Sequence, residues 1–325
     1  MARVASRGLG FALASVGLVG LTALAACKGK SGGSGPVVVG STSLPAPVAS
    51  SLPIDPKVVS AVVNPKGEAP YSGPTGTIRG IVTATGDEPP AQDEMLARIP
   101  ADCVAAKGFY GKLFREGPGR TLGDVVIGVT GYEGYVPEET TSQAADGAGC
   151  AWNSRTYVLT FGQGLDVRSR DSRPYVPDLI GAHLEAQLVA LPRGSAIHLY
   201  PEHPGRFELT DSMRLFMFAE VIVVKFPTHA VTGVDGQFVV PRVPVGKVTV
   251  SALLPVTLAQ VSKDVEVHAG ESVDVKFELP FDRAAWEATR NGIRSAAAKA
   301  RAGIAASASA SPPGAVPSSS ASPTH

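Results

Sequence analysis

The chain has 325 residues, which is long enough for two modest domains with tails. Its 29 basic and 29 acidic side chains balance, and no basic stripe that would displace phosphate counterions stands out, so we expect no nucleic-acid partner. The 36 glycines and 27 prolines are many for a helical protein and suit turn-rich β structure. The composition therefore favours an all-β protein.

The N-terminal segment has the pattern of a bacterial export signal. Arg3 and Arg7 supply positive charge, and an uncharged apolar run over residues 8–26 ends in small residues and a cysteine. Because of that ending, the run indicates a secretory signal rather than an ordinary membrane span. The sequence Leu-Ala-Ala-Cys resembles the lipobox of bacterial lipoproteins. This resemblance implies that residues 1–26 are removed and that Cys27 carries a diacylglycerol thioether.

The same resemblance implies where the protein is located. Several acyl chains hold a protein stably at a membrane, whereas one chain holds it marginally. Lys28 follows the cysteine, and in this family a residue other than aspartate there points to the outer membrane. We therefore expect a lipid-anchored protein of the cell envelope, at the outer membrane. The alternative is an unmodified signal peptide with a chance cysteine.

The remaining two cysteines, Cys103 and Cys150, are expected to pair. In an exported protein two cysteines more often form a disulfide than stay free. Closing a loop of this length contributes roughly 4 kcal/mol in the chain-entropy model. Neither cysteine lies in a Cys-x-x-Cys motif, so a redox or zinc role is the weaker interpretation.

The first half of the mature chain starts with a linker and continues with strands. Residues 27–75 are rich in Gly, Ser and Pro and are expected to form a flexible linker. Short β-prone runs follow at 76–86 and 122–131. Residues 156–170 predict two strands around the turn Gly162-Gln163-Gly164.

The second half has the clearest strand pattern, over residues 228–281. Asp235-Gly236 is the residue pair of a tight hairpin, and valines alternate with polar residues on both sides of the sequence HAGES. The pattern then changes, because residues 282–307 are rich in Ala with scattered Arg and Lys and favour a helix. The last residues, 308–325, predict a disordered tail.

Two separated blocks of this pattern resemble a known family. TIRGIVTATG near the start, with AVTGVDGQFVVPRVPVGKVTVSALL and VEVHAGESVDVKFEL near the end, resembles the carboxypeptidase regulatory-like domain, which is a transthyretin-like β-sandwich. The family's turn residues are matched by Asp235, Gly236, Phe238, Pro244 and Gly246, while Gly233 replaces an aspartate. In that family the sandwich is an accessory module, so the resemblance implies no peptidase activity.

The segment between these blocks, residues 148–226, resembles the cupredoxin-like insert of exported proteins labelled methylamine utilisation protein. The family's copper ligands are replaced here. Asp211 stands in place of the copper cysteine, Arg214 and Tyr175 in place of histidines, and only Met217 keeps its type. An arginine has no lone pair to donate and a lone thioether is a weak ligand. We therefore expect no metal and no cofactor, and we interpret DSMRLFM (211–217) as a hydrophobic strand.

Other candidate groups give weaker signals. His183, His198 and His203 could form a different Cu(I) site, but exposed loop histidines are the favoured interpretation. His229 and His268 have no suggestive neighbours. No hydrolase motif occurs, and nothing in the sequence places Asp124 and Glu133 across a cleft as a carboxylate pair. The chain is therefore not expected to be an enzyme.

These observations predict a transthyretin-like β-sandwich with an inserted cupredoxin-like β-sandwich, a C-terminal helix and disordered tails. The expected order is signal peptide (1–26), linker (27–75), first part of the outer sandwich (76–147), insert (148–226), second part (227–281), helix (282–307) and tail (308–325). The expected function is that of a non-catalytic, lipid-anchored structural or interaction module, with the membrane and an unknown protein or glycan as partners. Two alternatives remain: a carbohydrate-binding module using exposed aromatics among Tyr132, Tyr135, Trp152, Tyr175 and Tyr200, and a copper or electron-transfer protein, which the replaced ligands disfavour.

Overall fold

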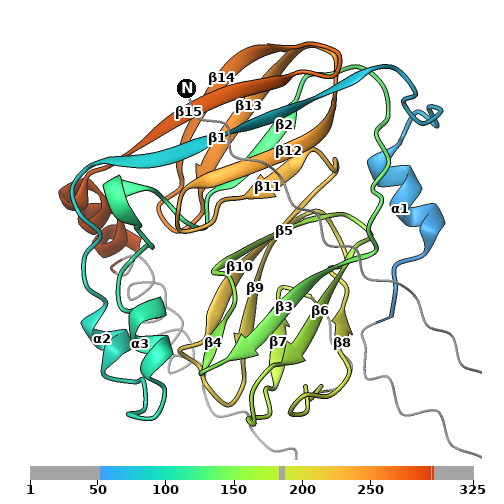
Figure 1. Cartoon of the computed structure of the whole chain (residues 1–325). Coiled ribbons are helices and arrows are strands. Elements are labelled where there is room, and N and C mark those ends of the chain that lie inside the picture. Colours follow the sequence, from blue (N-terminus) through green and yellow to red (C-terminus); the bar gives the residue numbers. More distant parts are fainter. Residues whose placement is uncertain (1–51, 183–186, 294, 296–325) are drawn as a thin grey trace, which may run out of the picture. The chain divides into compact units, whose positions relative to one another are not determined.

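The computed structural model describes residues 52–182, 187–293 and 295. In this part of the chain most regular structure is β, arranged in sheets that pack around two hydrophobic cores (Figure 1). The expected all-β fold class is confirmed. The expectations for residues 1–51, and for the helix and tail beyond the described C-terminal residues, lie outside the described chain.

The first sandwich combines strands from both ends of the described chain. One sheet has the order β12-β1-β15 and the other β11-β2-β13-β14. The strands are β1 (Thr75–Gly86), β2 (Val126–Thr130), β11 (His229–Val231), β12 (Gln237–Pro244), β13 (Gly246–Leu254), β14 (Ala259–Val267) and β15 (Ser272–Phe281). In β15 every second side chain from Val275 to Phe281 is buried, as its period-two pattern predicts. These side chains meet Ile127 and Val250 of the opposite sheet in one core.

The second sandwich is built from the middle of the chain. Its sheets have the orders β4-β3-β6-β8 and β5-β10-β9-β7. The strands are β3 (Ser142–Ala148), β4 (Ala151–Trp152), β5 (Thr156–Thr160), β6 (Gly164–Ser169), β7 (Pro177–Ile180), β8 (Ile197–Leu199), β9 (Gly205–Asp211) and β10 (Phe218–Val224). All five residues of β5 are buried, because β5 pairs in parallel with β10 and is covered on both faces.

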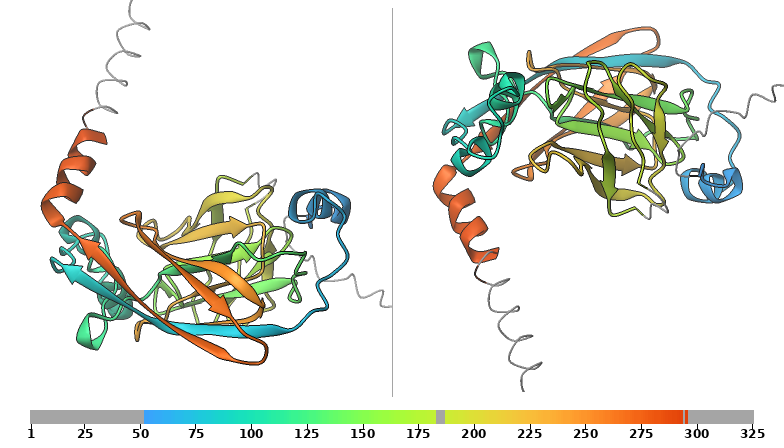
Figure 2. Two further views of the ribbon diagram at one scale, coloured as in Figure 1. Left: turned by 90° about the horizontal axis from the view of Figure 1, so that it is seen from above. Right: turned by 90° about the horizontal axis from the view of Figure 1, so that it is seen from below.

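Short helices lie between the strands. These are α2 (Asp93–Leu96), α3 (Val104–Tyr110) and the 3₁₀ turn η1 (Pro118–Arg120), and a further helical stretch, 283–293, follows β15 (Figure 2). Ala106 and Tyr110 of α3 are buried in the core of the second sandwich. Strand β3 also belongs to that sandwich, so residues 76–147 do not serve the first sandwich alone. Helix α3 belongs to the second sandwich because its apolar residues Ala106 and Tyr110 pack in that core.

The linker expected over residues 27–75 contains a helix in its described part. Helix α1 (Pro56–Val63) begins at Asp55, whose side chain accepts a hydrogen bond from the backbone N of Lys57 at 2.8 Å, and proline occupies its first turn. Val59 and Val63 pack against the second core. The composition of this segment suggested flexibility, but its apolar side chains recur at helical spacing and are covered by a neighbouring core.

The expected Asp235-Gly236 hairpin is also wrong in its pairing. The turn is present, since Gly236 N donates to Gly233 O at 2.8 Å. However, the flanking strands β11 and β12 pair with β2 and β1, in opposite sheets. The turn between β5 and β6 likewise joins strands of different sheets. Turn residues determine where the chain reverses, whereas the partner of each strand is set by core packing.

We predict that Gly236→Ala lowers the free energy of unfolding by about 3 kcal/mol or more. The backbone φ of Gly236 is 72°, and an added Cβ would lie 2.4 Å from Val82 O. Gly270→Ala is the matched control, because φ there is 71° and nothing lies within 4 Å of an added Cβ. It should cost only about 1 kcal/mol. Chemical denaturation of both variants is the measurement, and equal losses would contradict the role assigned to the close backbone.

Candidate functional site

The segment DSMRLFM is not a strand. It forms two successive turns between β9 and β10, in which Arg214 N donates to Asp211 O at 3.0 Å and Met217 N to Arg214 O at 2.7 Å. The Asp211 carboxylate fixes the first turn by accepting from Met213 N at 3.0 Å. A strand would place the side chains of Met213, Leu215 and Met217 on one face. Instead Met217 is fully buried, while Met213 and Leu215 are 62% and 79% exposed.

The positions that the cupredoxin resemblance assigns to copper do come together. The Arg214 guanidinium carbon lies 5.0 Å from the centre of the Tyr175 ring, and its Nη1 lies 3.5 Å from Asp211 Oδ1. Arg214 also donates to Pro174 O at 3.0 Å. Asp211 Oδ2 accepts from Val176 N at 2.8 Å. The side chain of arginine thus supplies the positive charge in this cluster.

Tyr175 is held in the same way by groups of the chain itself. Its hydroxyl donates to Asp171 Oδ2 at 3.1 Å and accepts from Cys150 N at 3.3 Å. Burial raises the pKa of Tyr175 to about 12, so the phenol keeps its proton at neutral pH and is a poor ligand. These residues do not fit a copper ion: a permanent cation lies among them, and the Met217 side chain is packed in the core.

The histidines considered for an alternative Cu(I) site bind separate partners. His198 Nδ1 lies 2.6 Å from Asp166 Oδ1, and His203 Nδ1 lies 3.0 Å from Pro204 O. His183 lies outside the described residues. Within the described ranges, no group of three or more His, Cys, Asp or Glu side chains is placed to hold a metal ion.

His229 has neighbours that the sequence did not suggest. Its Nε2 lies 3.0 Å from Thr160 Oγ1, and that hydroxyl donates to Glu138 Oε2 at 2.7 Å. Burial lowers the pKa of His229 to about 4, so the imidazole is neutral at physiological pH. Burial acts to raise the pKa of Glu138, but hydrogen bonds from Thr160 and Thr140 outweigh it, and the pKa is lowered. This chain of hydrogen-bonded groups links β11 of the first sandwich to β5 of the second.

The predicted disulfide between Cys103 and Cys150 is present, with 5.5 Å between the two Cα atoms. Cys103 lies at the start of α3, and Cys150 lies in the turn between β3 and β4. The bond therefore attaches α3 to the second sandwich and closes a loop with a sequence separation of 47 residues. Cys27, the expected lipidation site, lies outside the described residues.

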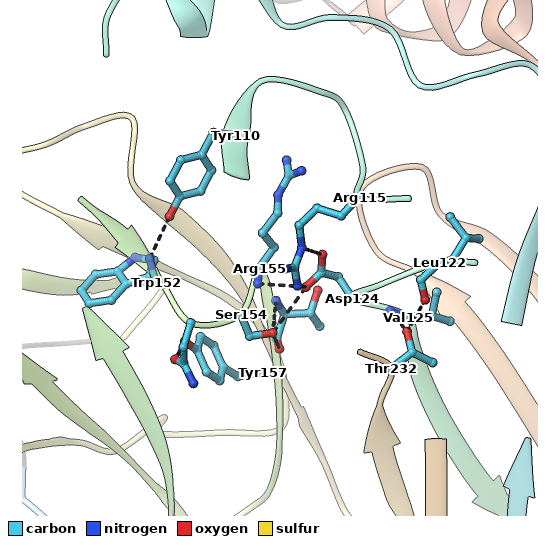
Figure 3. A network of polar contacts seen from close by, with 12 residues as sticks. Tyr110, Arg115, Leu122, Asp124, Val125, Trp152, Ser154, Arg155, Tyr157 and Thr232 are labelled. Atoms are coloured by element: carbon cyan, nitrogen blue, oxygen red, sulfur yellow. Dashed lines mark hydrogen bonds and ion pairs between the residues drawn. The ribbon is translucent and has the colours of Figure 1, made fainter. Parts of the chain in front are cut away.

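A buried carboxylate lies where the loop before β2 meets the start of β5 (Figure 3). Both Asp124 oxygens accept from the Arg115 guanidinium, one of them at 2.6 Å from Nε. Asp124 Oδ1 also accepts from Arg155 N at 3.0 Å and from Ser154 Oγ at 3.4 Å. The side chain of Asp124 is only 6% exposed, so these partners replace the water that it loses. Asp124 is thus one member of a buried ion pair with Arg115.

Arg155 extends this network into the second sandwich. Its guanidinium donates to Lys112 O at 3.0 Å and to Leu113 O at 3.1 Å. It lies 5.9 Å from the ring centre of Tyr110 and 5.5 Å from that of Phe218. Burial lowers the pKa of Arg155, although Asp124 opposes this effect. The sequence could not indicate this network, since its members are far apart in the chain and none belongs to a motif.

The five aromatic side chains considered for a sugar site divide between a hydrophobic core and the walls of cavities. Trp152 and Tyr175 are buried, at 1% and 0% exposure. Tyr132, Tyr135 and Tyr200 are half-buried, and the last two line a cavity beside α1. Two of the five candidates are therefore core residues that cannot present a face to a sugar ring.

We predict that Asp124→Asn lowers the free energy of unfolding by about 3 kcal/mol, because the Arg115 charge would stay partly buried without its partner. Asparagine is the suitable substitution, since φ is 67° at this position and asparagine tolerates that conformation. Asp274→Asn, which removes an exposed ion pair with Arg79, should leave the free energy of unfolding nearly unchanged. Urea titration of both variants checks this, and equal effects would contradict it.

No family model matches the chain, and no curated protein matches it. Among solved structures, the chain is similar to the reduced state of an amicyanin mutant with 19% identity and a TM-score of 0.23, covering 25% of this chain and 80% of that one. A second reduced amicyanin mutant gives 18% identity and a TM-score of 0.23 over 26% and 83% of the two chains. A Cu(I) amicyanin mutant gives 17% and 0.23 over 27% and 86%.

Proposed function

We propose that the chain is a non-catalytic, lipid-anchored protein of the bacterial cell envelope that acts as an interaction module. In this proposal a carboxypeptidase regulatory-like sandwich carries a cupredoxin-like insert whose metal positions now have a structural role. The proposal is carried by one observation: the polar groups of the loop between β9 and β10 bond within the chain, while Met213 and Leu215 face solvent.

This loop has the properties of a recognition surface. Its shape is fixed by Asp211 and Arg214, so little conformational freedom is lost when a partner binds. Met213 and Leu215 are large, apolar and exposed on this turn. A partner that covers them removes apolar surface from water, which makes the free energy of binding more favourable. A glycan partner is less well supported, since Trp152 and Tyr175 lie in the core. An electron-transfer role is not supported, because the cluster does not fit copper.

Membrane attachment in this proposal depends on Cys27, the cysteine of the lipobox-like sequence. Among the described residues no helix has the length and apolar character needed to cross a membrane. The acyl chains would hold the folded part at the outer membrane through the segment that precedes α1.

We predict that a photo-crosslinking amino acid placed at Leu215 gives a discrete adduct in intact envelopes. Leu258, which is 64% exposed in the turn between β13 and β14, is the matched control and should give no such adduct. Gel analysis after irradiation is the measurement. Equal labelling from both positions, or none from either, would refute an interaction surface at this loop.

We predict that the purified domain binds neither Cu(I) nor Cu(II) tightly and shows no blue absorbance. The arginine charge opposes a cation, and the thiolate that blue-copper chemistry needs is replaced by an aspartate. Isothermal titration with both ions is the test. A stoichiometric site of sub-micromolar affinity, abolished by Met217→Leu or His198→Ala, would restore the copper-carrier alternative.

We predict that Cys27→Ser leaves a precursor that is neither cleaved nor lipidated, because only a thiol forms the thioether. Mass spectrometry of the mature N-terminus and membrane fractionation are the measurements. Cys103→Ser is a suitable control, since it removes a cysteine of the disulfide and should leave lipidation intact. A processed and acylated N-terminus in Cys27→Ser would show that the anchor is elsewhere.

A further inference from the structure

A cavity of about 450 Å³ lies between α1 and the turn that joins β5 to β6. A second cavity of about 230 Å³ adjoins it and shares Val63, Tyr135, Val136 and Lys225 as lining residues. Pockets of several hundred cubic ångströms are the size of small-molecule sites. Helix α1, labelled in Figure 1, provides one wall of the larger cavity, and its last residue, Val63, lines the smaller one together with the segment that follows the helix.

This wall is held in place by the backbone. A Cβ on Gly162 would lie 2.7 Å from Val59 Cγ1, so glycine is needed for the helix to approach the turn this closely. On its C-terminal side, the segment after α1 is fixed where Tyr71 N donates to Tyr135 O at 2.7 Å. The cavity is therefore formed before any ligand binds, which reduces the entropy that binding costs.

Several polar groups of the cavity already have partners within the chain. Glu138 accepts hydrogen bonds from Thr140 N at 3.0 Å and from Thr160 Oγ1 at 2.7 Å. Gln163 accepts from Thr160 N at 2.6 Å and donates to Thr140 Oγ1 at 2.6 Å. A sugar needs several uncommitted donors and acceptors around its hydroxyl groups, and these residues do not supply them. The rest of the wall is largely apolar, with Ile54, Val59, Val136 and Phe161.

Lys225 is the exception among the charged lining groups. It follows β10 directly and is exposed. No hydrogen bond, ion pair or ring contact joins its ammonium group to any other described residue. The other charged lining groups have partners: Glu138 accepts the hydrogen bonds given above, and Lys66 pairs with Glu68 at 3.5 Å. An unpaired cation at the point shared by the two cavities, of which the larger is mostly apolar, complements a ligand with an apolar body and one negative charge.

We infer that this cavity binds a small apolar carboxylate, with the carboxylate at Lys225 and the apolar body between α1 and the turn after β5. The site is separate from the loop between β9 and β10, so the inference goes beyond the proposed interaction function. The failure of either one would leave the other intact.

Isothermal titration of the whole mature chain with decanoate tests the inference, with decanol as the uncharged comparator. We expect saturable binding of one decanoate per chain and weaker binding of decanol. Lys225→Met should weaken decanoate binding about tenfold, and Lys225→Arg should restore most of it. Lys247→Met, at an exposed lysine of β13, should leave affinity unchanged.

A second pair of variants tests the place of the apolar body. Ser60→Trp adds a large side chain at an exposed α1 position that lines the cavity, whereas Ala61→Trp adds it at an exposed α1 position that does not. Only Ser60→Trp should reduce decanoate affinity. No saturable decanoate binding, equal effects of Lys225→Met and Lys247→Met, or equal effects of the two tryptophans would overturn the inference. Binding of a maltooligosaccharide in place of decanoate would overturn it in favour of a sugar site.

Discussion

The buried ion pair of Asp124 and Arg115 is the interaction on which the joined sandwiches most depend. The side chain of Asp124 is only 6% exposed. Its burial is tolerated because the Arg115 guanidinium and the backbone N–H of Arg155, in the second sandwich, donate to its oxygens. Arg155, whose own N–H binds Asp124, then places its guanidinium on two backbone carbonyls of the loop before β2. Each sandwich thus supplies charges or dipoles that the other needs, which favours one fixed arrangement at the junction over many.

The cluster of Tyr175, Asp211 and Arg214 fixes the loop between β9 and β10. The Arg214 guanidinium is positively charged and has several N–H donors. It can therefore pair with the Asp211 carboxylate and donate to the Pro174 carbonyl at the same time. Its planar face also packs on the tyrosine ring. The loop is ordered by these contacts, and the side chains of Met213 and Leu215 are directed outward. These features are the basis for proposing that the loop is a contact surface.

Helix α1 links the fold to the proposed ligand cavity. The helix is too short to be stable by itself, so its geometry depends on packing against the second core. That packing is possible because Gly162 has no side chain to exclude Val59. A segment whose composition resembles a linker therefore forms the wall of a preformed cavity.

The sequence by itself determined the β class, the pairing of Cys103 with Cys150 and the period-two pattern of β15, because these depend on turn residues, on cysteine number and on local alternation. Only the tertiary structure decided which strands pair across the Asp235-Gly236 turn, that DSMRLFM forms turns, and that α1 is ordered. The physical reason is that these features depend on contacts between distant residues, such as Asp124 with Arg155 or Val59 with Gly162. Local propensity contains no information about such contacts.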